Sequence, residues 1–171
     1  MNKTAIAYYT LHGSSAVVAQ VLSERYSCDV IELEEAKPRG KGFFGFISAG
    51  FQAASNKKSK LKIDVNEKLS SYERIIVISP VWASKTVPAV NTLLSKLDLK
   101  DKSVVAFTIQ ADPDHKDAPK IAESIRQRVK DQGGRLLLCY HLHSKGVKTA
   151  ASSEDVDEQL KGFFEAYKSI N

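Results

Sequence analysis

The sequence of 171 residues contains little cysteine and no long hydrophobic run. Its two cysteines, Cys28 and Cys139, are far apart, which is typical of reduced thiols and excludes a small disulfide scaffold. The longest strongly apolar run, residues 43–54, is shorter than the roughly 20 apolar residues that a membrane-spanning helix requires. No charged leader followed by an apolar segment opens the sequence, so we expect a cytoplasmic protein without a membrane span.

Composition and length indicate an ordinary globular protein. Hydrophobic residues make up 43% and charged residues 26% of the chain, so intrinsic disorder is not expected. A chain of this length usually forms one compact core, and we expect a single domain over residues 1–171.

The net charge of +5 is concentrated in one segment. Residues 37–62 contain seven basic residues and no acidic residue, and the rest of the chain is slightly acidic. A run of lysines is usually a solvated face, and aromatic residues in such a connection usually pack on a sheet or cover a ligand. We therefore do not expect nucleic-acid binding or an interfacial membrane anchor. The basic residues are Lys37, Arg39, Lys41, Lys57, Lys58, Lys60 and Lys62.

Strand patterns alternate with helical patterns along the chain. Such alternation predicts an α/β protein whose parallel sheet is covered by helices on both faces. Pro80 is expected to close the third strand, because proline cannot donate to a central ladder, and Ser14 or Ser15 is expected to cap the first helix. The expected strands are residues 3–9, 28–33, 73–79, 102–110 and 135–142. The expected helices are a first helix that follows the Ser14 or Ser15 cap and ends at residue 26, and residues 43–54, 87–97, 118–132 and 153–169.

Ligands of open α/β sheets bind beyond the carboxyl ends of the strands, where the strand order reverses. The loop after the first strand, residues 10–15, combines three hydroxyls, an imidazole and a glycine immediately before a helix. This arrangement predicts a phosphate site, because donors converge where the helix dipole favours an anion. The simpler alternative is that Ser14 and Ser15 only cap the helix, with Gly13 turning the chain.

Several other classes of α/β protein are excluded by spacing. The loop after the first strand lacks both the G-x-G-x-x-G dinucleotide pattern and the G-x-x-x-x-G-K-[ST] pattern of P-loop NTPases. A phospho-acceptor signalling domain would require acidic residues where this chain has Tyr9, Thr10 and Ser79. No G-x-S-x-G elbow supports a hydrolase.

Two loops carry a resemblance to a known family. Thr10-Leu11-His12-Gly13-Ser14-Ser15 resembles the flavodoxin phosphate loop, [ST]-x-T-G-x-T, and Ser79-Pro80-Val81-Trp82-Ala83-Ser84 resembles the Ser-Pro-x-Trp-Ala-Gly segment of flavodoxin-like proteins. Residues 42–61 also resemble the aromatic and glycine-rich connector of one subgroup. The resemblance covers nearly the whole chain. It implies a flavodoxin-like three-layer sandwich with five parallel strands in the order 2-1-3-4-5.

The resemblance implies that FMN binds without a covalent bond, with its phosphate on the first loop and its ring against Trp82. The flavin would perform the redox chemistry, so no catalytic side chain and no metal are required. His12 and Ser84 replace the family's threonine and glycine, and stacking from the loop after the fourth strand would fall to His115. The implied cofactor-binding residues are Thr10, Leu11, His12, Gly13, Ser14, Ser15, Pro80, Val81, Trp82, Ala83, Ser84, Gln110, Ala111, Asp112 and His115.

Three functions remain open at this point. The leading prediction is an FMN-binding electron carrier or small oxidoreductase whose redox partner protein is acidic at its contact surface, opposite the basic segment. The alternatives are an NAD(P)H-dependent quinone or FMN reductase of the same fold and a flavin-free binding module. Trp82 could also simply pack on the core. Cys139, His141 and His143 alternate along one strand, but three such close ligands without a fourth make a metal site the less favoured interpretation.

Overall fold

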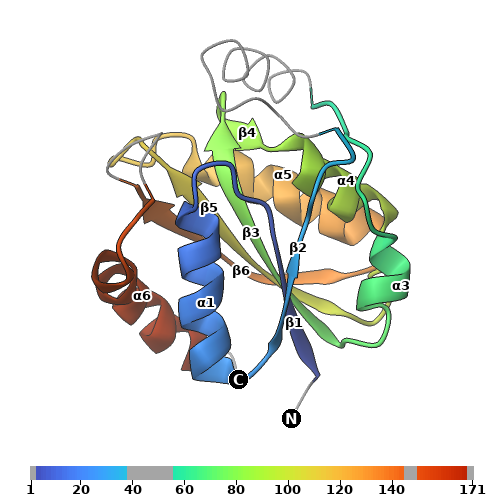
Figure 1. The fold of residues 1–171 in the computed structure, drawn as a ribbon, viewed down its shortest axis with the longest axis horizontal. Coiled ribbons are helices and arrows are strands. Elements are labelled where there is room, and N and C mark those ends of the chain that lie inside the picture. The colour runs from blue at the N-terminus through green and yellow to red at the C-terminus, as the bar shows by residue number, and fades with distance from the viewer. Residues whose placement is uncertain (1–2, 38–55, 145–149, 169–171) are drawn as a thin grey trace.

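The computed structural model describes residues 3–37, 56–144 and 150–168, and its centre is a parallel sheet with helices on both faces (Figure 1). The five parallel strands pair in the order β2-β1-β3-β5-β6, which confirms the predicted order and the three-layer architecture. A sixth strand, β4, pairs antiparallel with the end of β3 and was not predicted. The strands are β1 (Thr4–Tyr8), β2 (Asp29–Glu32), β3 (Arg74–Trp82), β4 (Lys85–Thr86), β5 (Ser103–Gln110) and β6 (Arg135–His143).

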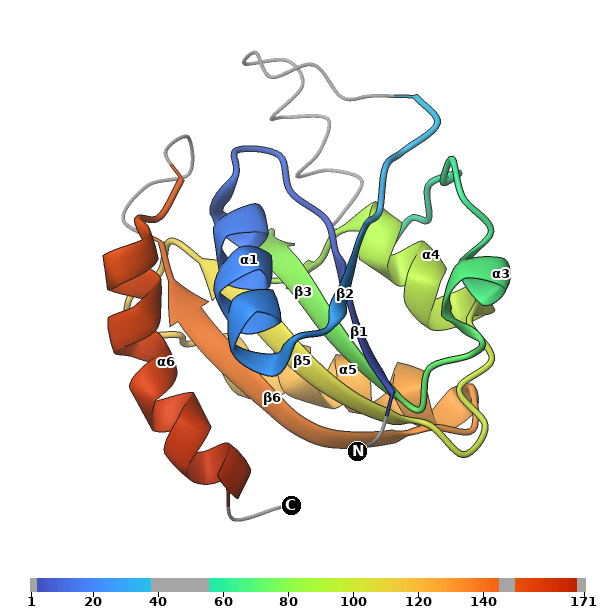
Figure 2. The ribbon, with the colours of Figure 1, turned by 60° about the horizontal axis from the view of Figure 1, so that its bottom comes forward.

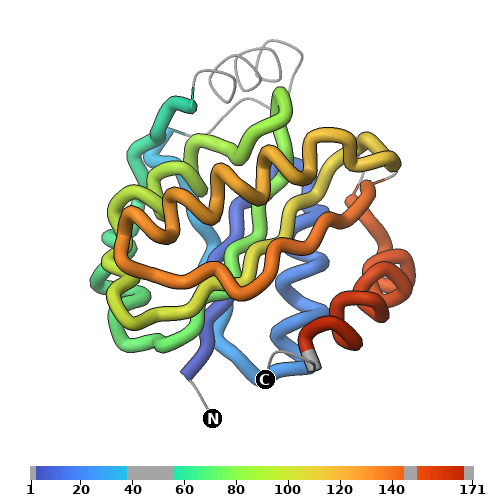
Figure 3. The backbone as a smooth tube through the Cα atoms, turned by 180° about the vertical axis from the view of Figure 1, so that it is seen from behind, coloured from blue at the N-terminus to red at the C-terminus, as the bar shows by residue number. Residues whose placement is uncertain are grey.

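The helices form two layers, seen from two further directions in Figures 2 and 3. Helices α1 (Ser14–Tyr26) and α6 (Ser153–Lys168) cover one face of the sheet. Helices α3 (Val65–Leu69), α4 (Pro88–Lys96) and α5 (Ala118–Asp131) cover the other face. None of the helices in the described ranges is long and apolar enough to cross a bilayer.

The central strands are buried on both faces, which explains their continuous apolar sequence. Along β3, Ile75 and Val77 pack on the side of α4 and α5, whereas Ile76 and Ile78 pack on the side of α1 and α6. Phe107 of β5 is fully buried on the side of α1 and α6. Each central strand therefore packs against two separate cores, one on each face of the sheet.

The end of the third strand was predicted wrongly. β3 does not stop before Pro80 but continues to Trp82, with Pro80 in register with Ile109 of β5. β1 ends at Tyr8, which pairs with Ile78, so β3 has no parallel β1 partner from Ser79 onward. A proline is tolerated there because this part of β3 is no longer flanked by strands on both sides.

The start of the first helix also differs from the prediction. Helix α1 begins at Ser14, its N-cap is Gly13 in the left-handed region, and no side chain caps it by a hydrogen bond. The short helix α3 was not predicted, and β6 extends one residue further, to His143. The helix expected over residues 43–54, and the resemblance over residues 42–61 for the most part, lie outside the described residues.

Candidate functional site at the carboxyl edge of the sheet

Three segments that are distant in sequence meet at the carboxyl edge of the sheet (Figure 1). They are the loop after β1, the hairpin of β3 and β4, and the loop after β5. Parallel pairing of β3 with both β1 and β5 brings them to the same edge, and this edge includes the point where the strand order reverses. The structure thus brings together the segments that contain the predicted site residues.

The loop after β1 is tightened by one hydrogen bond. The backbone N–H of Gly13 donates to Thr10 Oγ1 over 2.9 Å. Gly13 has φ +101°, and a Cβ added to it would lie 3.1 Å from the Cβ of Ala150. Glycine is therefore required here both by the left-handed backbone and by the close approach of the segment that precedes α6.

Ser14 has a structural role that the sequence did not reveal. Its hydroxyl oxygen accepts from the backbone N–H of Ala151 over 3.2 Å and lies 3.4 Å from the hydroxyl of Ser144. These contacts fasten the start of α1 to the chain after β6. Ser15 is buried, whereas Thr10 and His12 are partly exposed.

The hairpin of β3 and β4 turns through Ala83 and Ser84, both with positive φ, at 47° and 60°. Two-residue hairpins with positive φ at both central positions favour asparagine or glycine, so alanine and serine are strained here. The hydroxyl of Ser84 donates to the carboxylate of Asp117, which directly precedes α5. This bond joins the hairpin to the start of α5. It uses a serine at the position where the flavodoxin-like segment has glycine.

Trp82 is partly buried against the core on the side of α4 and α5. Its ring makes an edge contact with Tyr9, with the ring centroids 5.7 Å apart and the planes at 85°. The hydroxyl of Tyr9 in turn donates to Glu35 over 3.4 Å. Core packing therefore accounts for the buried part of the Trp82 side chain, and Trp82 is the last residue of β3, at the carboxyl edge of the sheet.

The loop after β5 is organised by its own polar side chains. The carboxylate of Asp112 accepts from the backbone N–H groups of Asp114 and Lys116, each over 3.1 Å. Both bonds lower the pKa of Asp112, and the bond from the Lys116 N–H has the larger effect. The buried Gln110 donates through Nε2 to Nδ1 of His115 over 2.6 Å. His115 is thereby held in the loop, with a positive φ of 50°.

Cys139, His141 and His143 alternate along β6, and Cys139 packs on the side of the sheet where α5 lies. Burial raises the pKa of the Cys139 thiol to about 12. His141 shares a hydrogen bond of 2.6 Å with the Thr108 hydroxyl, and its pKa is lowered by burial and then by the charge of His115. Cys28 and Cys139 are both free thiols. Over residues 3–37, 56–144 and 150–168, no three metal-ligating side chains are close enough to hold a metal ion.

Comparison with known proteins identifies the fold. Neither a protein-family profile nor a curated protein matches the sequence. Solved structures match almost the whole chain. Two from Bacteroides uniformis and Bacteroides eggerthii, provisionally described as flavoproteins, share 19% and 17% identity, with TM-scores of 0.69 and 0.68. They match 94% and 95% of this chain and 98% of their own chains.

A flavoprotein from Lactobacillus acidophilus, solved in complex with FMN, shares 21% identity over 82% of this chain and 93% of its own, with a TM-score of 0.64. The chain has the flavodoxin-like fold. The flavodoxin-like architecture inferred from the two loop motifs is therefore confirmed.

The strained hairpin of this flavodoxin-like fold gives a test of the turn geometry. We expect Ala83→Gly to raise the free energy of unfolding by roughly 0.5–1 kcal/mol, because the left-handed region disfavours a Cβ and glycine enters it freely. Ala122→Gly in the middle of α5 is the matched control and should lower that free energy by about 1 kcal/mol. Urea denaturation measures both, and equal destabilisation by the two variants would contradict the turn assignment.

Proposed function

We propose that this protein is an FMN-binding redox protein that acts as an electron carrier or small oxidoreductase. The observation that supports this function best is the convergence of the loop after β1, the Trp82 hairpin and the loop after β5 at the edge where the strand order reverses. The fold supports it as well, since a neighbour with the same fold was solved in complex with FMN.

The first loop fits a phosphate group. Thr10 Oγ1 accepts a hydrogen bond from Gly13, which leaves its own proton available to an external acceptor. The first N–H groups of α1 have no acceptors within the helix, and the helix dipole favours an anion there. Residues 10–15 include no acidic side chain that would repel a phosphate, and the partly exposed His12 adds a further donor.

The other two segments fit a flat aromatic ring. Trp82 and the strained turn that follows it would lie along one side of the ring, with Ala111, Asp112 and His115 along another. When bound, FMN would supply the redox chemistry, and the protein would tune it by contacts and charge. The low pKa of Asp112 keeps its carboxylate ionised at neutral pH, so it would oppose additional negative charge on the ring.

The phosphate loop should determine the affinity for FMN. Replacing Thr10 and Ser15 together with alanine removes two hydroxyl donors, each worth roughly 1.5–3 kcal/mol toward a charged group, so FMN should bind at least about tenfold more weakly. Quenching of FMN fluorescence measures the affinity. Ser14→Ala is the control, because its hydroxyl is already engaged by Ala151 and Ser144 and its loss should affect stability more than FMN affinity.

Unchanged FMN affinity in the folded double variant would reject the phosphate loop. Wild-type protein that is colourless when purified and does not quench added FMN would instead favour the flavin-free alternative. Reduction of the bound flavin by NADH or NADPH in stopped-flow measurements would favour the reductase alternative.

Trp82 should report flavin binding directly, because it is the single tryptophan of the chain. FMN should strongly quench its emission. Trp82→Ala should weaken FMN binding by about 0.5–1.5 kcal/mol beyond the loss of contact area if the rings interact, whereas Trp82→Phe should retain most of the affinity. Full tryptophan emission at saturating FMN would show that Trp82 only packs against the core.

We also propose that the redox partner is acidic at its contact surface. Lys57, Lys58 and Lys60 are exposed, and Lys62 forms an exposed ion pair with Glu34 over 2.5 Å. Arg39 and Lys41 lie outside the described residues. Opposite charge on a partner would accelerate encounter at low ionic strength.

Replacing Lys57, Lys58 and Lys60 with glutamine should slow oxidation of the reduced protein by ferricyanide, an anionic acceptor, at low salt. The effect should shrink as salt rises, because the screening length is only about 8 Å at 0.15 M. The control replaces the exposed Lys96, Lys100 and Lys130, which changes the net charge equally. Two results would contradict a role of Lys57, Lys58 and Lys60 in attracting anionic acceptors. One is that both triple variants slow the oxidation by ferricyanide equally, and the other is that the first variant slows oxidation by a neutral benzoquinone as much as oxidation by ferricyanide.

A further inference from the structure

Two histidine rings lie close together where β5 and β6 end. The ring centroids of His115, in the loop after β5, and His141, on β6, are 6.2 Å apart, and the ring planes are inclined by 40°. Nδ1 of His115 is 2.6 Å from Nε2 of Gln110. Nδ1 of His141 is 2.6 Å from the hydroxyl oxygen of Thr108. We call these four side chains the histidine cluster, and it connects the loop after β5 to the last two strands of the sheet.

The contact with Gln110 defines the protonation state of His115. An amide nitrogen only donates, so Nδ1 of His115 accepts and the ring is neutral, with its proton on Nε2. A proton on Nδ1 would place two donors face to face across this short distance. Gln110 is buried, and its side-chain amide has no second partner among the described residues. Proton uptake by His115 therefore requires the amide to turn, so that its oxygen accepts from Nδ1.

The contact with Thr108 imposes no such requirement on His141. A hydroxyl both donates and accepts, so Thr108 can bond to Nδ1 of His141 in either protonation state. The charged form itself is disfavoured, because burial first and the charge of His115 second lower the pKa of His141. The first proton therefore enters the cluster at His115, which is the ring whose hydrogen bond must change.

The loop after β5 also contains a negative charge that favours this proton. The pKa of Asp112 is lowered, first by the backbone N–H of Lys116 and last by the charge of His115. Asp112 therefore stays ionised while His115 gains its proton, and the two opposite charges attract each other.

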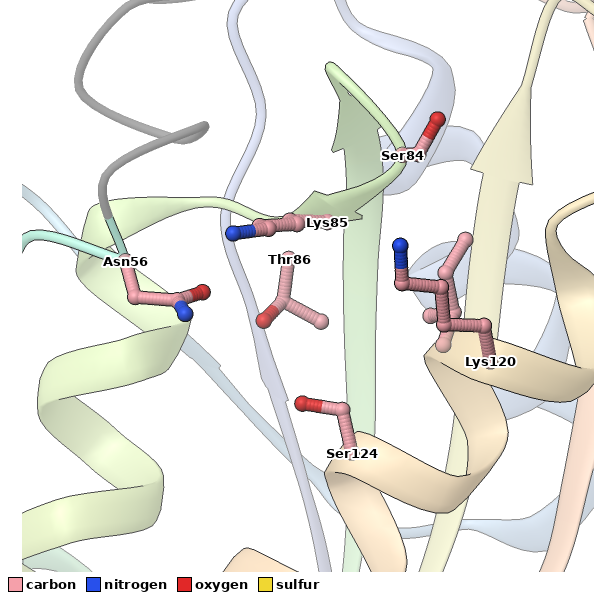
Figure 4. A pocket seen from close by; sticks show the side chains of 7 residues that line it. Asn56, Ser84, Lys85, Thr86, Lys120 and Ser124 are labelled. Atoms are coloured by element: carbon pink, nitrogen blue, oxygen red, sulfur yellow. The ribbon is translucent and has the colours of Figure 1, made fainter.

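The neighbouring elements do not hold either ring in its charged form. The carboxylate of Asp117 accepts from the hydroxyl of Ser84, which Figure 4 shows directed away from the pocket between the hairpin and α5. Cys139 of β6 is neutral, since burial raises its pKa to about 12. Over residues 3–37, 56–144 and 150–168, no carboxylate forms an ion pair with either ring. The other titratable or charged groups of the loop, of the adjacent part of α5 and of the end of β6 are Asp114, Lys116, Lys120, Glu123, Arg126 and His143.

We propose that the histidine cluster is a pH-sensitive switch in the loop after β5. At higher pH both rings are neutral and Gln110 donates to His115. As the pH falls, one proton from the solvent enters at His115, the Gln110 amide turns, and the loop gains one positive charge at the carboxyl edge of the sheet. Repulsion across 6.2 Å opposes a second proton at His141.

The consequence for FMN rests on the proposed function. His115 and Asp112 belong to the segment that would lie along the flavin ring, where the Asp112 carboxylate alone would oppose negative charge. The imidazolium of His115 would offset this carboxylate, so the site would favour reduced over oxidised FMN more strongly at low pH. The switch would thus make the redox balance of the bound flavin depend on pH.

NMR of the full chain without FMN tests the switch itself. The ring signals of both histidines and the side-chain amide of Gln110 are followed from about pH 8.5 to about pH 5, which spans the ordinary titration of histidine. The Gln110 amide should change with the same midpoint as His115, and His141 should titrate at a lower pH. A Gln110 amide that does not respond, or one midpoint common to both rings, would overturn the proposal.

Two variants separate the charge from the hydrogen bond. His115→Asn suits the positive φ of 50° at this position, and it should raise the midpoint of His141 by at least about 0.5 pH unit, the effect of a unit charge about 6 Å away in water. His143→Asn removes a ring two positions away and is the control that should leave the His141 midpoint unchanged. Gln110→Glu keeps an acceptor facing His115 and should raise the midpoint of His115 by roughly one pH unit or more. Unchanged midpoints in the folded His115→Asn and Gln110→Glu variants would reject the switch.

The effect on the flavin is measured separately, from the reduction potential of bound FMN about one pH unit above and below the His115 midpoint. At the lower pH the wild type should favour reduced FMN over oxidised FMN at least about threefold more than His115→Asn does, and at the higher pH the two should agree. Equal preference at both pH values with FMN bound would overturn the regulation of the site. Failure of FMN to bind would instead reject the proposed function, and the ring titrations would still decide the switch.

Discussion

The parallel pairing of β3 with β1 on one side and β5 on the other is the interaction on which the candidate site depends. Ile78 is opposite Tyr8, and Pro80 is opposite Ile109, so the three strands end within a few residues of each other. A shift of one residue in this register would turn every β3 side chain to the opposite core. Burial on both faces prevents such a shift, because Ile75 through Ile78 are almost completely buried. The segments that follow β1, β3 and β5 therefore begin at fixed positions relative to one another.

Much of this architecture could be predicted because it depends on local patterns. The apolar run in β3 and the alternation of strands and helices indicated a parallel sheet, and the two loop motifs supplied the strand order. The predictions were wrong at positions where a contact with a residue distant in sequence decides the local structure. Pro80 was expected to end its strand, but its effect depends on where β1 stops. Ser14 was considered as a cap, but its hydroxyl is used by Ala151, and Gly13 occupies the cap position.

The candidate site was predictable in its residue types and less so in its contacts. The motifs indicated the loop around Gly13 and the segment around Trp82, and the parallel pairing of β1 with β3 places both segments at one edge of the sheet. The bond between Ser84 and Asp117 spans 33 positions, and no local pattern indicates it. Only the packing of the hairpin on α5 brings these two residues together.

The contacts of Ser14 with Ser144 and Ala151 also affect the order in which the site can form during synthesis. They join positions 130 and 137 residues apart. A nascent chain emerging from the ribosome presents Thr10 and Gly13 early, yet the groups that hold Ser14 are translated near the end. The loop after β1 therefore acquires its final support only when β6 and the segment before α6 have emerged. An interrupted chain ending before residue 144 would carry the phosphate-loop motif without the contacts that fix it.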